Sequence, residues 1–100
     1  MNSLRTTSAQ ATLGRLGGEL DLATAPYVAA YLERLVHPGT HLMLDLSEVT
    51  FMDCAGLAPI LAAHERAALG GGWVLLRHVP RGPLMVVRLT GTWHLLDVGG

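Results

Sequence analysis

Apolar residues along this chain follow two spacings, one typical of strands and one typical of helices. Residues 41–49 and 73–79 are short, almost unbroken apolar runs, which predict strands covered on both faces. Residues 11–20 alternate more loosely, with leucines set among glycines, and predict an irregular strand with bulges or close backbone approach. A last strand is expected over residues 93–98.

Helical spacing marks the segments between these strands. Over residues 24–36, Thr24 is placed as an N-cap and Pro26 lies in the first turn, where its missing N–H costs nothing. A second helix is expected over residues 56–69, ended by three glycines, and a short third one over residues 80–91. The predicted apolar stripes are Val28, Leu32, Leu35 and Val36 in the first helix, and Leu57, Ile60, Leu61, His64 and Ala68 in the second.

The predicted order, β-α-β-α-β-α-β, has no internal domain boundary. Right-handed crossovers would place helices on one or both faces of the sheet. We therefore expect an α/β fold with a mixed four- or five-stranded sheet flanked by helices, formed by residues 11–100. The polar residues 1–10 are expected to be a disordered end or a short edge strand.

Composition and charge narrow the range of functions. Half of the 100 residues are apolar, which is enough for one dense core. The net charge of −1 gives no strong attraction to nucleic acid or anionic lipid, and no apolar run approaches the ~18 residues that span a bilayer, so we expect neither nucleic acid binding nor direct membrane insertion. The absence of signal-peptide features and the single cysteine predict a cytoplasmic protein.

Residues 51–61, FMDCAGLAPIL, hold the candidate chemistry, because Asp53 and Cys54 lie where a helix is predicted to begin. A cysteine phosphatase would need an arginine six positions after Cys54, where this chain has Ile60. His64 lies too far along the same helix to act as a base, about 15 Å away at helical rise. The five histidines lack the paired spacing of metal ligands. We therefore expect a protein that is not an enzyme, with no catalytic residue, cofactor or metal.

Two structural interpretations of this motif stay open. Cysteine is often a small buried hydrophobe, and Asp53 is well placed to be nothing more than an N-cap.

Four segments of the chain resemble the STAS domain family, in the order that the family has them. They are GELDLATA (18–25), LMLDLSEVTFMDCAGLAPIL (42–61), GGWVLL (71–76) and RLTGTWHLLDV (88–98). The resemblance implies a single STAS-type domain that binds partners without catalysis. In the bacterial anti-sigma factor antagonists of this family, an anti-sigma factor with a kinase-like fold binds the loop after the third strand. It phosphorylates a serine directly after the motif's Asp, and the phosphoserine releases the complex.

Matched to this motif, Asp53 is the acid and Asp21 is the acid of the neighbouring loop. Cys54 occupies the phosphoserine position, and a serine kinase is not expected to modify its thiol. Pro59 is a second departure, tolerated if the helix begins near Gly56 so that Pro59 lies in the first turn. The resemblance implies a partner-binding surface, in which Leu57 serves as an apolar anchor, made of Asp21, Thr24, Asp53, Cys54, Ala55, Gly56 and Leu57.

The predicted function is that of a partner-switching protein similar to an anti-sigma factor antagonist, acting as a monomer or weak dimer. One alternative is a STAS accessory subunit of a lipid-transport ABC complex, whose ATPase would meet the same helix start. Another is a thiol-based sensor, in which oxidation of Cys54 adds bulk and charge. A degenerate family member that binds constitutively is the simplest alternative.

Overall fold

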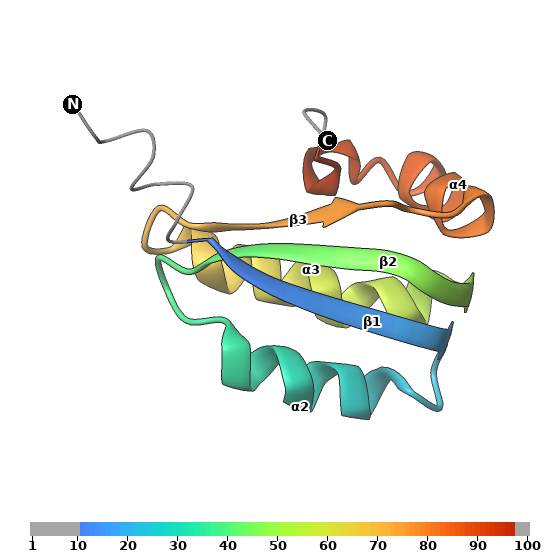
Figure 1. The fold of residues 1–100 in the computed structure, drawn as a ribbon, viewed down its shortest axis with the longest axis horizontal. Helices are drawn as coiled ribbons and strands as arrows, with labels where there is room; N and C mark the ends of the chain where they lie inside the picture. The colour runs from blue at the N-terminus through green and yellow to red at the C-terminus, as the bar shows by residue number, and fades with distance from the viewer. Residues whose placement is uncertain (1–10, 98–100) are drawn as a thin grey trace.

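Three parallel strands form the centre of the structure, a computed structural model that describes residues 11–97 (Figure 1). The central strand β2 (His41–Met52) pairs with β1 (Thr12–Leu20) on one side and with β3 (Trp73–Arg77) on the other. Parallel neighbours need a crossover connection, which the helices α2 (Ala25–Leu35) and α3 (Cys54–Ala68) provide.

The helices leave part of one sheet face open. In Figure 1, α3 runs behind the strands and α2 lies beside β1, while α4 (Arg81–Leu89) and the 3₁₀ helix η1 (Trp93–Leu95) lie next to β3. On β2, Leu42 and Leu44 point into the core, whereas Met43 and Asp45 lie half-buried on the opposite, open face. None of the helices in residues 11–97 has the length and apolarity needed to cross a membrane.

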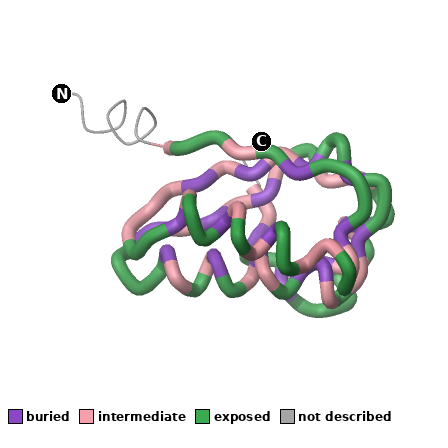
Figure 2. Tube along the Cα trace, turned by 90° about the horizontal axis from the view of Figure 1, so that it is seen from below, coloured by how far each residue is buried: buried purple, intermediate pink, exposed green. Residues whose placement is uncertain are grey.

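The buried residues gather where the sheet meets α2 and α3 (Figure 2). Leu57 and Ile60 are buried as predicted, but Leu61 and His64 are only half-buried and Ala68 is exposed. Ala63 and Ala67 take their place in the core, where small side chains let α3 approach its neighbours closely.

The start of α3 differs from the prediction. The helix begins at Cys54, with Asp53 as its N-cap, and not near Gly56. Pro59 therefore lies in the second turn, where its ring nitrogen cannot donate to the carbonyl of Ala55. The prediction that Pro59 sits in the first turn is wrong, because the cap formed by Asp53 starts the helix two residues earlier.

The predicted last strand is also wrong over the residues that the structure describes. Residues 93–95 form η1, and only Leu96 makes a parallel bridge, to Leu76 of β3. A local bond from the Leu95 N–H to the Thr92 carbonyl (3.0 Å) turns the backbone out of an extended path. Residues 11–97 thus contain three strands, all parallel, and a mixed sheet of four or five strands is not confirmed. The predicted edge strand or disordered end in residues 1–10 lies outside the described residues.

Candidate functional site

The end of β1 and the start of α3 are held together, which brings the two predicted partner-binding loops side by side. The Asp53 N–H donates to the Leu20 carbonyl oxygen over 3.2 Å. A Cβ built on Gly56 would overlap the same carbonyl oxygen, so only glycine permits this approach. Residues 21–24 follow Leu20 directly, and they therefore lie beside residues 53–55.

Asp53 caps α3, as its position in the motif predicted. Its backbone is extended, and its Oδ1 accepts a hydrogen bond from the Gly56 N–H at 2.9 Å. The other carboxylate oxygen, Oδ2, has no hydrogen-bond partner within residues 11–97 and remains available to a donor from another molecule.

Asp21 and Thr24 brace each other across the loop that precedes α2. The Asp21 N–H donates to Thr24 Oγ1 at 2.9 Å, and the Thr24 N–H donates to Asp21 Oδ1 at 3.0 Å. The Thr24 hydroxyl donates to the Glu19 carbonyl at 2.8 Å. Thr24 occupies the N-cap position of α2, but its side chain bonds within the loop and caps no N–H of the helix. The two hydrogen bonds tie residues 21 and 24 together, and Leu22 between them is 77% exposed.

Cys54 lies at the first position of α3 with an exposed thiol, so it is not a buried hydrophobe. His64 lies ten residues further along α3, about 15 Å away at helical rise, which is too far for it to act as a base for the thiol. Within residues 11–97 no group of three or more metal-ligating side chains comes together. The motif therefore places an exposed thiol at the N-terminus of α3.

Two predicted members of the surface are in the core. Leu57 is 3% exposed and Gly56 is buried, because both face the sheet from the first turn of α3. The prediction that Leu57 is an apolar anchor for a partner is wrong: Leu57 positions the helix from inside.

Sequence reasoning missed two exposed apolar side chains at this end of the sheet. Phe51 is 48% exposed and lies in register with Glu19, on the face opposite Leu20 and Met52. Leu22 is the other. Strand alternation continued to Met52 would have placed Phe51 outward, but the predicted strand ended at residue 49.

The two segments that meet at this surface are acidic. Segments 16–24 and 46–57 contain no lysine or arginine, and they contribute four carboxylates: Glu19, Asp21, Glu48 and Asp53. Exposed apolar side chains among carboxylates make a surface suited to a partner with basic and apolar groups.

Comparisons with known proteins agree with this fold. A family model described as "Mlab, STAS domain" matches residues 3–97. The chain is also 25% identical over 83 residues to the anti-sigma-B factor antagonist of Bacillus subtilis (strain 168), an alignment that covers 83% of this chain and 76% of that protein. With nearly its whole length matched by the family model, the chain belongs to the STAS domain family.

Proposed function

We propose that this STAS domain is an anti-sigma factor antagonist that binds, without catalysis, an anti-sigma factor with a kinase-like fold. The contact would be the helix-mouth surface, which we define as Asp21, Leu22, Phe51, Asp53, Cys54 and Ala55. The observation that carries the proposal is the bond from the Asp53 N–H to the Leu20 carbonyl, since it places both loops side by side in one surface. A cytoplasmic location and a monomeric or weakly dimeric state are part of the proposal.

The chemistry of the helix-mouth surface supports protein binding. Leu22 and Phe51 provide apolar area that a partner would bury, and the hydrogen-bonded loop lowers the entropy lost on binding. The free Oδ2 of Asp53 would accept a hydrogen bond from an arginine or lysine of the partner. Thr24 contributes by bracing the loop from within.

Cys54 and Ala55 favour a second candidate function. Neither residue has a hydroxyl, so the position that carries the phosphoserine in the antagonists cannot release the partner in the usual way. A constitutive complex is the natural result, and it would also suit an accessory subunit of a lipid-transport ABC complex that meets its ATPase at the same surface.

A pulldown from native cytosol distinguishes the two candidates. Wild-type protein should recover a kinase-like anti-sigma factor, whereas recovery of a transporter ATPase would favour the second candidate. The variant Leu22→Ala should lose the captured protein. Leu69→Ala is the matched control, because Leu69 is 82% exposed and directly follows the opposite end of α3. Equal recovery by both variants would contradict the proposed surface.

A further inference from the structure

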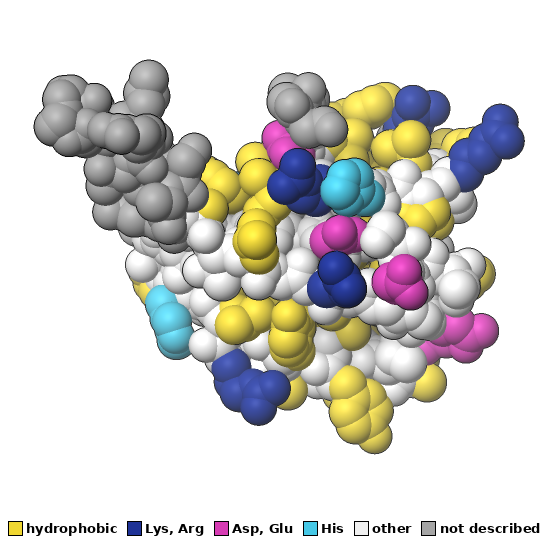
Figure 3. Space-filling model, viewed as in Figure 1, with side chains coloured by type: hydrophobic (Ala, Val, Ile, Leu, Met, Phe, Trp, Pro, Cys, Tyr) yellow, Lys and Arg dark blue, Asp and Glu magenta, His cyan; other side chains and the backbone are white. Residues whose placement is uncertain are grey.

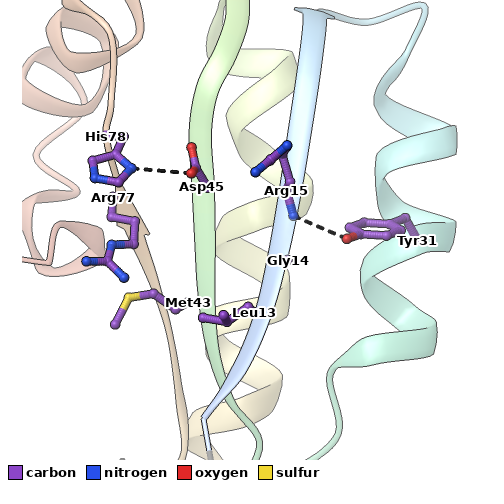
Figure 4. Close-up of a pocket in the computed structure, with 8 residues that line it drawn as sticks. All are labelled: Leu13, Gly14, Arg15, Tyr31, Met43, Asp45, Arg77 and His78. Carbon is purple, nitrogen blue, oxygen red and sulfur yellow. Dashed lines mark hydrogen bonds and ion pairs between the residues drawn. The ribbon is translucent and has the colours of Figure 1, made fainter.

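A hollow of about 440 Å³ lies on the open face of the sheet, away from the helix-mouth surface. Asp45 in the hollow and Met52 at the end of β2 are seven residues apart, roughly 20 Å along a strand. The space-filling view shows basic, acidic and histidine side chains gathered near the middle of this face (Figure 3). The lining residues, drawn in Figure 4, are Leu13, Gly14, Arg15, Tyr31, Met43, Asp45, Arg77 and His78.

Strand register sets two arginines on either side of one carboxylate. Arg15, Asp45 and Arg77 are register neighbours on β1, β2 and β3. Both oxygens of Asp45 are engaged elsewhere: Oδ1 accepts from the Ser47 N–H at 2.7 Å, and Oδ2 lies 3.3 Å from His78 Nδ1. Neither arginine has an ion-pair partner among the residues that the structure describes.

Arg77 has a buried hydrogen-bond donor in the hollow that no described acceptor meets. Its Nε is buried and has no hydrogen-bond partner within residues 11–97. A buried donor without an acceptor is costly, and such groups in native proteins usually meet a protein group, water or ligand. Figure 4 shows the guanidinium turned toward Met43 and away from Asp45, so an anion beside it would avoid the carboxylate.

His78 closes the same side of the hollow in an unusual conformation. Its φ is 54°, which makes it the one residue other than glycine with a positive φ in the described part of the chain. Its ring lies 3.3 Å from Asp45 Oδ2, and a backbone in the left-handed region is uncommon for residues other than glycine.

Apolar side chains form the other side of the hollow. Leu13 and Met43 are register neighbours, and Leu13 is 75% exposed. A small concave site that combines an apolar wall with a few converging polar groups is typical of small-molecule binding. Because the charged groups left unpaired are cationic, the polar end of a ligand would be an anion.

We propose that this hollow binds a small, free organic anion, namely a phosphate or carboxylate on a short apolar group. Arg77 holds the anionic group, and Leu13 and Met43 contact the apolar part. The inference goes beyond the proposed function, since it concerns a different face of the molecule and a small molecule in place of a protein.

Amide chemical shifts of the full chain, followed by NMR during titration, test the site. Four probes test whether binding needs the anionic group, the apolar group or both: hexyl phosphate, hexanoate, inorganic phosphate and hexanol. We expect saturable shifts at residues 13–15, 43–45 and 77–78 with hexyl phosphate or hexanoate, binding of inorganic phosphate weaker by about tenfold, and no saturation with hexanol. Absence of saturable shifts with both organic anions, or shifts confined to the helix-mouth surface, would overturn the proposal.

Charge variants assign the binding to the hollow. Arg77→Gln should weaken binding of hexyl phosphate by about tenfold or more, while Arg34→Gln, a control on α2 outside the hollow, should not. The spectrum of each variant reports whether it is folded. If Arg77→Gln fails to fold, Arg77→Lys replaces it, and this variant should also bind more weakly because lysine lacks the Nε–H donor. Equal affinities of Arg34→Gln and the folded Arg77 variant would overturn the site. Arg77-dependent sedimentation with anionic vesicles, without hexyl phosphate binding, would overturn the free-ligand claim in favour of a lipid headgroup.

Discussion

The N–H of Asp53 and the carbonyl of Leu20 lie 3.2 Å apart, and this bond joins the end of β1 to the start of α3. Gly56 allows the approach, because any side chain at that position would overlap the same carbonyl. Gly56 therefore lets the start of α3, with the exposed Cys54, lie close to the end of β1, while the Asp53 side chain caps the helix.

Replacing Gly56 with alanine should separate these two segments. The added Cβ overlaps backbone, which cannot move aside cheaply, so we expect a loss of about 1–3 kcal/mol in the free energy of unfolding by urea. Gly82→Ala is the matched control: its Cβ meets nothing within 4 Å and it lies in α4, so it should leave stability unchanged or raise it by up to ~1 kcal/mol. A Gly56→Ala variant as stable as wild type would refute the close approach.

Substitutions at Asp53 should separate capping from partner binding. Asn caps a helix about as well as Asp, so Asp53→Asn should keep its melting temperature, whereas Asp53→Ala should lose about 1 kcal/mol. If the free Oδ2 meets a cation of the partner, Asp53→Asn should still bind the partner more weakly. Calorimetry of unfolding and of binding measures the two effects, and unchanged binding by Asp53→Asn would leave Asp53 with a capping role alone.

Cys54 should make the complex insensitive to ATP. Incubated with the kinase-like partner and ATP, the wild-type chain should remain unmodified and bound. Cys54→Ser should become phosphorylated if the partner's kinase site is active. Cys54→Glu should bind poorly, since a buried charge without a partner costs several kcal/mol.

Mass spectrometry and a binding assay report both results for position 54. Tight binding by Cys54→Glu would place position 54 outside the contact. Release of the partner by mild peroxide, absent in Cys54→Ser, would favour the thiol-sensor alternative instead.

The contribution of Asp45 to the stability of the fold should depend on pH in the acid range. Hydrogen bonds from Ser47, followed by His78, lower the pKa of Asp45 from 3.8 to about 2. A pKa lowered by folding stabilises the protein above the unfolded value, and this contribution disappears as the pH falls from 3.8 to about 2. Wild type should therefore exceed Asp45→Asn in stability at neutral pH, and the difference should shrink across that window.

Urea unfolding at a series of pH values measures the effect of Asp45. The His78→Ala variant should retain most of this pH dependence, because the hydrogen bonds from Ser47 lower the pKa of Asp45 more than His78 does. A difference between wild type and Asp45→Asn that stays constant down to pH 2 would contradict this assignment.

The sequence predicted the elements better than their ends. Periodicity located all three described strands and the helices α2, α3 and α4, because each buries a clear apolar face. The expected last strand failed because WHLLDV is apolar enough for a strand, yet a local turn at Thr92 and stacking of the exposed Trp93 under Arg88, 5.6 Å away, favour η1.

The functional surfaces depended more on tertiary structure. The resemblance to the family indicated Asp21, Asp53 and Cys54, which the fold brings to one end of the sheet. It could not show that Leu57 turns inward, since that depends on where α3 begins. The hollow could not be predicted at all, because Arg15, Asp45 and Arg77 become neighbours only through the register of three strands.

The affinity of the purified anti-sigma factor for Leu22→Ala tests the central claim most directly. Leu22 contributes little to the fold, being 77% exposed, so its loss should leave stability unchanged. We expect the Kd to rise by about tenfold or more, as at an apolar hot spot, while Leu69→Ala binds like wild type. Wild-type affinity in Leu22→Ala, or an equal loss in Leu69→Ala, would contradict the account of the helix-mouth surface.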